Sequence, residues 1–586
     1  MNQNENKQYK ITFIFIIIFV AFVLLIANIF HIMFDNQKLP KLVITESDRA
    51  IRGDILSAGH FKIATSKKLY KAIVDTRNID PNKKEMFIDL FSTFSGMDKE
   101  EVREKIESKF GFVTLTYKLD SKSARYVNQL NSKLFSLGVF VEYTDQKRGR
   151  KFLHGLSVIE SGEYRIYPLK DCLTPVIGYV AKYEDRGYTN IVGKYGLEKY
   201  YQKELEGIQS TKITGRRDIR NNIIFDSNSI VKNRYDGYDV VTSISIPLQR
   251  SVEMILDKMR DELNAKEIIA SVMDSKSGAI IAIASSRRFD ITHVKDANAL
   301  TISAIRYIFE PGSVMKPIIF SLLLKRDLIK LDEIIRTYNG KFYLQNTPIT
   351  DEHRYPYLSA ENIIVHSSNI GMAQISQRLD PLDYFQGLRD FGFGQKSKID
   401  LSYELAGSIP SIHQLKNSVF KATASYGYGI KVNFFQLLKA YNVFNNNGYL
   451  LQPSIGRELR SPIHNQIIEK DKPFRVLPQN ITQTMKNILI KTVQEGTGKG
   501  AITKGIEVGG KTGTAQIAIR GAYEKVYNSS FFGFANGKNN HYTIGVTVIE
   551  PDPNSPVHFA SKSAVPVFKR IVDEMVKRRY LSPFSN

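Results

Sequence analysis

The hydrophobic and polar positions divide the chain into one continuously apolar stretch and a long remainder of mixed pattern. Residues 11–34 contain no charged side chain and are almost entirely aliphatic or aromatic. At the rise of an α-helix this stretch reaches about 36 Å, which is enough to cross the hydrocarbon core of a bilayer. The pattern therefore predicts a transmembrane helix over residues 11–34, preceded by a short tail of residues 1–10.

A cleaved signal peptide is the alternative interpretation of this stretch. Its apolar core would span ~7–15 residues and end at a cleavage site made of small residues. The run found here is longer, and its exit from Phe30 to Phe34 is bulky, so we expect a retained anchor. Lysines lie on both sides of the span, and large domains cross membranes largely regardless of such charges. The orientation must therefore come from the chemistry of the chain.

After the anchor, residues 35–235 carry a mixed charged and apolar pattern without a repeat or a Pro/Ser-rich linker. A turn followed by a strand-like stretch over residues 240–244 places a domain boundary near residue 236. We expect an α+β pedestal over residues 35–235 and a separately folded module within it from residue 49. Strand-like stretches are residues 69–75 and 138–143, and residues 99–109 are helix-like.

The second half, residues 236–586, shows clearer architecture. Two strands, a large helical middle, further strands and a final helix predict an antiparallel sheet flanked by helices. Asn433 is expected to cap a helix over residues 434–446, with Gln436 completing a capping box. The other expected helices are 246–263, 313–330 and 566–578, and the expected strands are 268–273, 279–284, 529–535 and 541–549.

Composition and charge narrow the classes of partner and of cofactor. The 586 residues are 42% hydrophobic and 24% charged, which is typical of globular proteins and argues against wholesale disorder. The formal net charge of +22 favours an anionic neighbour, such as nucleic acid, a membrane surface or an anionic polymer. Because Cys172 is the single cysteine, an intrachain disulfide, a multi-thiolate zinc site and a cysteine-ligated iron–sulfur cluster are excluded.

Ser313 and Lys316 form a Ser-x-x-Lys motif directly after the sequence Phe-Glu-Pro-Gly. If a helix begins near Pro311, the two side chains lie one turn apart on the same face. A lysine amine whose pKa is lowered by burial or by a second cation can take the proton of a serine hydroxyl and so activate it. A Ser-x-x-Lys also arises by chance in a chain of this length, so the motif alone does not identify a site.

A second motif is Ser367-Ser368-Asn369. Asn369 carries a donor and an acceptor and could hold a substrate amide, while the Ser367 hydroxyl could relay a proton. A polar helix cap or loop is the ordinary alternative for such a sequence.

The third motif is Lys511-Thr512-Gly513-Thr514, which follows two glycines. Lys511 would supply positive potential, the two threonine hydroxyls could bind a carboxylate, and Gly513 would let a substrate backbone pair with a strand edge. A glycine-rich turn beside an ordinary strand is the alternative. The same stretch also fits the letters of a phosphate-binding loop, but that loop must be followed by a helix, and the residues after Thr514 favour a strand.

Together, and in this order, the three motifs resemble the S-x-x-K, S-x-N and K-T-G signature of the penicillin-recognising serine enzymes. The resemblance extends over nearly the whole chain from residue 49, and it is closest to the class B penicillin-binding proteins. One departure is Ser57-Ala58-Gly59-His60, which replaces the usual D-R-N-G of the pedestal. Further segments that resemble this class are residues 309–316, 52–56, 193–198, 425–429 and 496–498.

Within the class, Ser367-Ser368-Asn369 and Tyr426-Gly427-Tyr428-Gly429 resemble the division-type, FtsI-like members. Elongation-type members usually carry Asp where Asn369 stands. The lack of a repeat domain before the last residue, Asn586, is expected of Gram-negative members. The resemblance therefore implies a serine β-lactamase-like transpeptidase domain over residues 236–586, active in septal wall synthesis.

The resemblance also implies the roles of the site residues. Ser313 would attack the penultimate D-Ala carbonyl of a stem peptide, Lys316 would take its proton, and Ser367 with Lys511 would pass that proton to the departing D-Ala. The peptide amide would lie on Asn369, and the terminal carboxylate on Thr512 and Thr514, with Gly513 between them. The backbone N–H groups of Ser313 and Thr514 would form the oxyanion hole.

The implied setting is the inner, cytoplasmic membrane, with a single span and an extracytoplasmic catalytic domain. Stem peptides ending in D-Ala-D-Ala are the expected substrates and β-lactams the expected inhibitors. A membrane glycosyltransferase and other division proteins are the expected partners, without nucleic acid, metal or cofactor.

Other functions share parts of this pattern. A D,D-carboxypeptidase or serine β-lactamase uses water as the acceptor, but the pedestal and the anchor argue against both. A β-lactam sensor would carry cytoplasmic signalling segments, which ten preceding residues do not supply. An elongation-type transpeptidase and a catalytically inactive scaffold are further alternatives, and intact Ser313, Lys316 and Lys511 argue against the inactive scaffold.

Overall fold

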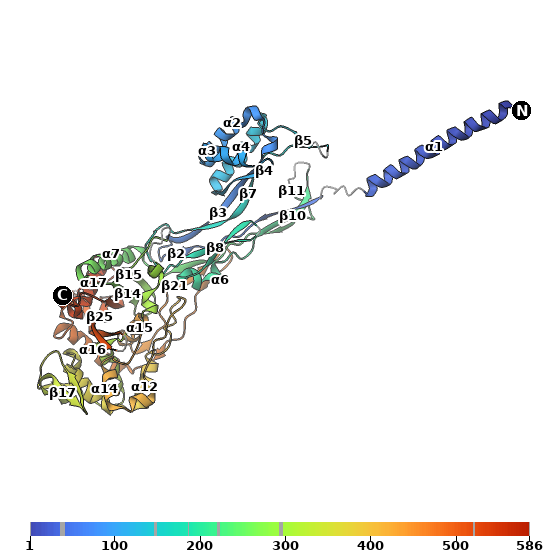
Figure 1. Ribbon diagram of the computed structural model, residues 1–586. Helices are drawn as coiled ribbons and strands as arrows, with labels where there is room; N and C mark the ends of the chain where they lie inside the picture. The colour runs from blue at the N-terminus through green and yellow to red at the C-terminus, as the bar shows by residue number, and fades with distance from the viewer. Residues whose placement is uncertain are drawn as a thin grey trace. The chain divides into compact units, whose positions relative to one another are not determined.

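The computed structural model describes residues 2–34, 42–145, 149–185, 187–218, 223–291, 297–519 and 522–584 (Figure 1). The chain forms two compact units. The first combines Met1–Ala50 with Gln209–Tyr235, and the second combines Ile51–Ile208 with Asp236–Asn586.

The first unit contains the apolar helix and a small antiparallel sheet. Helix α1, Asn2–Phe34, includes the predicted span and begins before it. Within its stretch Lys7–Met33, the most apolar 18 consecutive residues have a mean hydropathy of 3.2, and the stretch is long and apolar enough to cross a membrane. A helix suits that environment because it satisfies every backbone polar group internally. The strands are β1 (Val43–Asp48), β10 (Thr211–Arg217), β11 (Ile223–Ile224) and β12 (Ile230–Lys232), with β10 pairing with each of the other three.

In the second unit, a nine-stranded sheet runs through the region predicted as the pedestal and into the C-terminal half. Its strand order is β22-β21-β13-β2-β3-β7-β9-β8, with β4 paired to β3. The bounds are β2 Ile55–Leu56, β3 Lys62–Asp75, β4 Phe112–Leu119, β7 Leu156–Ile166, β8 Val180–Asp185, β9 Tyr188–Gly193, β13 Asp239–Thr242, β21 Gly456–Arg460 and β22 Asn465–Ile467.

Three helices cover one part of this sheet and share an apolar core with it. Asp98 and Asp120 cap two of them by accepting backbone N–H bonds, which satisfies donors that a helix start would otherwise leave unpaired. Residues 138–143, predicted as a strand, form only the isolated bridge between Phe140 and Ile79 before the short strand β5. The bounds are α2 Lys84–Ser95, α3 Lys99–Ser108, α4 Ser121–Ser136, β5 Tyr143–Asp145 and β6 Arg150–Phe152.

The predicted boundary near residue 236 is crossed by strand pairing and by packing. Strand β13, just after the predicted boundary, pairs in parallel with β2 and antiparallel with β21. The same hydrophobic core also contains residues from both sides, such as Leu197 and Ile244. Ile51–Ile208 and Asp236–Asn586 therefore lie in one compact unit, and separate folding of the pedestal stays a prediction.

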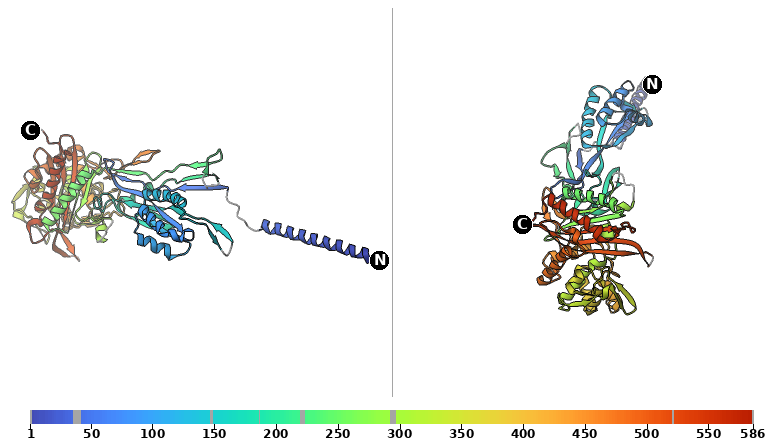
Figure 2. Two further views of the ribbon diagram at one scale, coloured as in Figure 1. Left: turned by 90° about the horizontal axis from the view of Figure 1, so that it is seen from above. Right: turned by 90° about the vertical axis from the view of Figure 1, so that its left-hand side faces the viewer.

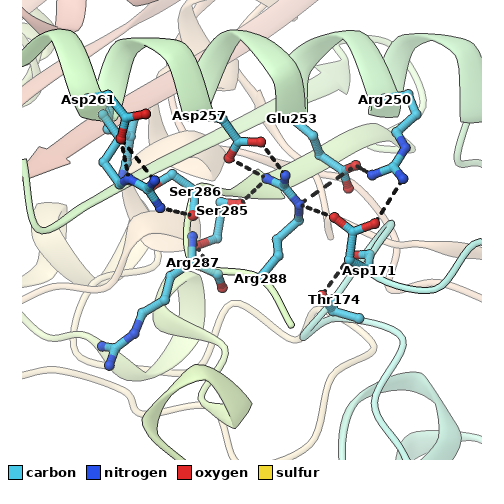
Figure 3. A network of polar contacts seen from close by, with 12 residues as sticks. Asp171, Thr174, Arg250, Glu253, Asp257, Asp261, Ser285, Ser286, Arg287 and Arg288 are labelled. Atoms are coloured by element: carbon cyan, nitrogen blue, oxygen red, sulfur yellow. Dashed lines mark hydrogen bonds and ion pairs between the residues drawn. The ribbon is translucent and has the colours of Figure 1, made fainter. Parts of the chain in front are cut away.

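A network of charged groups reinforces this junction (Figure 3). The Arg288 guanidinium binds Asp257 of helix α7 and lies 3.4 Å from the Asp171 carboxylate, in the loop after β7. The buried Glu253 carboxylate accepts the Leu173 backbone N–H at 2.7 Å and an Arg250 N–H at 3.0 Å. These bonds tie a loop of the pedestal region to α7 (Ile246–Leu263), which was predicted over these residues.

Glu198 is the buried centre of a second network. Its carboxylate accepts the Nε–H groups of Arg52 at 2.8 Å and Arg165 at 2.7 Å, and all three side chains are buried. Although burial alone would raise the pKa of the Glu198 carboxyl, the Arg165 and Arg52 guanidinium groups hold it below its usual range. The two pedestal segments noted in the sequence, around Arg52 and Glu198, therefore meet in space, and Arg165 joins them.

The C-terminal half is built on a five-stranded antiparallel sheet of order β15-β14-β26-β25-β24. Helices α7 and α17 pack side by side on one face, and α15 packs on the other (Figures 1 and 2). The neighbours Phe531 and Phe532 of β25 point to opposite faces, as alternation along a strand requires, and contact Phe568 of α17 and Phe434 of α15. The strands are β14 Glu267–Asp274, β15 Ile280–Ser285, β24 Glu507–Ile519, β25 Ala522–Asn536 and β26 His541–Ile549.

The helices predicted in the C-terminal half are all present, and one of them is shorter than predicted. Asn433 caps α15 and forms the predicted capping box with Gln436. The helix predicted over residues 313–330 starts as a 3-10 turn, Gly312–Met315, and its α-helical part α9 ends at Lys325. Other bounds are α5 Gly196–Tyr200, α6 Gln202–Leu205, α8 Ser303–Arg306, α10 Ala360–Val365, α11 Asn369–Ile375, α12 Pro381–Asp390, α13 Ile412–Leu415, α14 Ser418–Ser425, α15 Phe434–Asn445, α16 Gln479–Gln494 and α17 Ala564–Lys577.

The buried Glu198 network leads to a stability prediction. Replacing Glu198 by Ala leaves two buried guanidinium groups without their carboxylate, which should lower the free energy of unfolding by about 3–5 kcal/mol. Thermal unfolding of the detergent-solubilised chain measures the loss. Glu85→Ala is the matched control because Glu85 pairs with Arg103 at the surface, where little change is expected. Equal melting temperatures for the two variants would contradict a structural role of the buried pair.

Candidate active site

Ser313 lies in the 3-10 turn Gly312–Met315, and Lys316 is the first residue of α9. The Lys316 backbone N–H donates to the Ser313 carbonyl, so the two residues are one turn apart as predicted. Lys316 is completely buried, whereas Ser313 is partly exposed. The turn thus presents the serine hydroxyl at a surface and keeps the lysine amine inside.

Two glycines let other segments approach this turn closely. A Cβ atom on Gly513 of β24 would lie 2.8 Å from the Pro311 carbonyl oxygen, and one on Gly427 would lie 2.1 Å from the Gly312 oxygen. Gly427 also has a φ of 92°, which side chains rarely adopt. Gly513 therefore serves the approach of β24 to the serine turn, a role that the sequence argument had given only to a substrate backbone.

Ser367 lies in the turn between α10 and α11 and brings the three motifs together. Lys316 Nζ donates to the Ser367 carbonyl at 2.5 Å and approaches its Oγ at 3.2 Å. Lys511 Nζ donates to the same Oγ at 2.9 Å. Ser367 has a φ of 61°, an uncommon left-handed conformation for a non-glycine residue that costs free energy. The hydroxyl therefore bridges two lysine amines that are distant in the sequence.

The electrostatics of the two lysines favour a neutral amine. Burial lowers the pKa of Lys316 to about 7, although the Asp351 and Glu352 carboxylates act in the opposite direction. Burial and the neighbouring Lys316 charge together hold the pKa of Lys511 well below its usual range. Because two ammonium groups cannot share this buried space cheaply, the site can supply an amine base near neutral pH.

The remaining predicted residues line the same region. The Asn369 side-chain Nδ2 donates to the Thr350 carbonyl at 2.9 Å. The Thr512 hydroxyl lies 2.7 Å from that of Thr497, and the Thr514 hydroxyl accepts the Ala560 backbone N–H at 3.0 Å. Thr512 and Thr514 lie on β24, and Asn369 lies two residues after Ser367, at the start of α11.

Strand β24 is last in the strand order of its sheet and pairs with β25. Such an edge can accept an extended peptide as an added strand. Lys511 and the residues after it lie in strand β24 and not in a helix. A phosphate-binding loop must be followed by a helix, so the phosphate-loop interpretation is wrong.

Sequence analysis did not identify two acidic residues, Asp351 and Glu310, whose carboxylates bind backbone N–H groups around the site. The Asp351 carboxylate accepts the backbone N–H groups of Asn369 and Ile370, and the Glu310 carboxylate accepts that of Gly429 at 2.8 Å. A single acidic residue belongs to no recognisable motif, although Glu310 lies within residues 309–316, which resemble the family. Within the described residues, no cluster of three or more His, Cys, Asp or Glu side chains could hold a metal ion.

Comparison with known proteins gives the family. The family model "Penicillin binding protein transpeptidase domain" matches residues 268–573, and "Penicillin-binding Protein dimerisation domain" matches residues 47–242. The chain is 25% identical to the "Probable peptidoglycan D,D-transpeptidase PenA" of Neisseria meningitidis, covering 98% of this chain and 93% of the relative. It is 28% identical to the "Peptidoglycan D,D-transpeptidase FtsI" of Buchnera aphidicola, covering 74% of this chain and 72% of the relative.

Among solved structures, penicillin-binding protein 3 of Mycobacterium tuberculosis complexed with ampicillin shares the fold, with a TM-score of 0.65 and 21% identity. The match covers 92% of this chain and 98% of that chain. A transpeptidase domain that matches more than half of the chain, together with the dimerisation domain before it, shows the family. The chain belongs to the class B penicillin-binding proteins, and it is a serine-type peptidoglycan D,D-transpeptidase that resembles FtsI.

Proposed function

We propose that Ser313 is the nucleophile of this transpeptidase and Lys316 its base. Neutral Lys316 takes the hydroxyl proton while Ser313 Oγ bonds to the carbonyl carbon of the penultimate D-Ala of a stem peptide. Developing negative charge on the carbonyl oxygen is stabilised by the Ser313 and Thr514 backbone N–H groups. The observation that carries this proposal is the Ser367 hydroxyl between the Lys316 and Lys511 amines, at 3.2 and 2.9 Å.

That bridge provides a path for the proton. From Lys316 it passes through Ser367 and Lys511 to the nitrogen of the terminal D-Ala, which leaves as the carbon–nitrogen bond breaks. The amine of a second stem peptide then attacks the acyl-enzyme, forms the new amide bond and returns Ser313 to its hydroxyl form. Each shuttle residue gives up one proton as it accepts another, so the site ends each cycle in its starting state.

Substrate binding is assigned to the β24 edge and to α11. Thr512 and Thr514 bind the terminal carboxylate with their hydroxyl protons, while Gly513 between them lets β24 lie against the serine turn. The Thr514 oxygen already accepts the Ala560 N–H, but a hydroxyl can donate and accept at once. Asn369, the first residue of α11, holds the peptide amide. Glu310 and Asp351 hold the neighbouring backbone by accepting N–H groups of Gly429 and of the start of α11.

We assign the enzyme to septal wall synthesis. Ser367-Ser368-Asn369 and Tyr426-Gly427-Tyr428-Gly429 resemble the division-type members, and one relative carries the name FtsI. An elongation-type transpeptidase is the alternative.

The proposed setting follows from the anchor and the substrate. Helix α1 holds the protein in the cytoplasmic membrane by residues 11–34, with residues 1–10 inside, because stem peptides are crosslinked outside. Residues 35–235 serve as the pedestal and residues 236–586 as the transpeptidase domain. The pedestal region docks a membrane glycosyltransferase and other division proteins, and β-lactams inhibit the enzyme by acylating Ser313.

The nucleophile and base assignments predict the behaviour of two variants. Ser313→Ala should fold and lose all covalent labelling by penicillin, as intact-mass spectrometry shows. Lys316→Arg should fold and acylate at least ~100-fold more slowly, because a guanidinium with a pKa above ~12 cannot take the proton. Lys325→Arg, at the last turn of the same helix, is the matched control and should label normally. A near-normal rate for Lys316→Arg would mean that Lys316 supplies charge alone.

The septal role predicts the outcome of depletion. Cells that lose the protein should elongate into filaments without septa, while incorporation of a fluorescent D-amino acid continues along the lateral wall. Wild-type protein should restore division, and Ser313→Ala should not. Rounded or widened cells that still form septa would assign the enzyme to elongation.

A further inference from the structure

Asp351 lies directly after strand β18 (Thr347–Thr350) and contacts the start of α11 through both carboxylate oxygens. Its Oδ1 accepts the Asn369 N–H at 2.5 Å and the Ile370 N–H at 3.0 Å. Its Oδ2 accepts the Ser368 hydroxyl at 2.5 Å. These distances are those of charge-assisted hydrogen bonds, which are about twice as strong as neutral ones.

The contacts hold the turn on which the catalytic groups meet. The Ser368 oxygen also accepts the Gly371 N–H at 2.9 Å, so Asp351 and Ser368 together satisfy the free donors at the helix start. The preceding residue, Ser367, is in the left-handed conformation with a φ of 61°. A residue in that conformation persists only when its surroundings hold it there. The backbone N–H groups of Ser367 and Ser368 donate to the Ile364 and Ile363 carbonyls at 3.2 and 2.9 Å. Asp351 adds the bonds to the Ser368 hydroxyl and to the two N–H groups that follow.

Asp351 is also part of the charge balance around the base. Among the described residues, the charged groups that face Lys316 are Lys511 of β24 and the carboxylates of Asp351 and Glu352. Both lysines are fully buried, and neither has an ion pair within 4 Å among the described residues. The negative charge of Asp351 therefore stabilises the ammonium form of Lys316 at longer range and opposes the effect of burial.

We propose that Asp351 is a positioning residue for acylation, holding the Ser367–Asn369 turn in its strained geometry and supplying negative charge that faces Lys316. The inference rests on the proposed roles of Ser313 and Lys316. It assigns to one carboxylate two separable effects, one on the geometry of the turn and one on the protonation of the base.

Two substitutions separate these effects. Asp351→Asn keeps an oxygen that can accept the Asn369 and Ile370 N–H groups, replaces the acceptor of the Ser368 hydroxyl by an amide NH2 group, and removes the charge. Without that charge the ammonium form of Lys316 is less stable, so the pKa of Lys316 falls. Neutral Lys316 then persists to lower pH, and the acidic limb of the acylation profile moves down by about half a pH unit or more. Asp351→Ala removes the bonds as well, and the second-order acylation rate should fall at least ~tenfold across the profile.

The measurement is the rate of acylation by a fluorescent penicillin between pH 5.5 and 9 on the full chain in detergent. Asp380→Asn is the matched control, because Asp380 also caps a helix, α12, and its profile should be that of the wild type. Should Asp351→Asn fail to fold, Asp351→Ser is a second neutral variant that also caps helices well.

Three results would count against these assignments. An unmoved acidic limb in both neutral variants, or an Asp351→Ala rate within twofold of wild type, would overturn the role of Asp351. A wild-type protein that folds but is not acylated at Ser313 would instead contradict the proposed function, and this inference with it.

Discussion

Two lysines with no solvent exposure meet at one serine hydroxyl, and much of the C-terminal half is arranged around that constraint. Lys316 and Lys511 both approach Ser367 Oγ. Burying two ammonium groups together is unfavourable, so the arrangement displaces their pKa values downward and favours a neutral amine. A surface site would be screened by water and would leave both lysines charged at neutral pH.

Keeping those groups in contact requires segments to approach more closely than side chains allow. Gly513 admits β24 against the serine turn, and Gly427 admits the Tyr426–Gly429 segment against Gly312. Asp351 then holds the far side of the Ser367 turn through three hydrogen bonds. The catalytic geometry therefore depends on backbone contacts as much as on the side chains of the three motifs.

Charge pairing also stabilises the pedestal region, where buried carboxylates bind guanidinium groups. Glu198 forms ion pairs with Arg52 and Arg165 inside the core, and the Asp171–Arg288 network ties the neighbouring loop to α7. Strand β13 continues the sheet across the expected boundary. Sequence analysis did not foresee this pairing, because strand pairing between distant segments leaves no mark in local composition. The strand expected over residues 138–143 failed for a similar reason, since its apolar residues pack without a partner strand.

By itself the sequence determined the local features: the apolar helix, the capping box at Asn433, the strands β14 and β15, and the three motifs with their order. These depend on residue type and short spacing, which the chain displays directly. Only the tertiary structure decided which groups meet. It placed Ser367 between two lysines, brought Asp351 to α11 and made Gly513 a contact surface for the serine turn. Those contacts join residues far apart along the chain, and they are selected by packing and charge pairing over the whole fold.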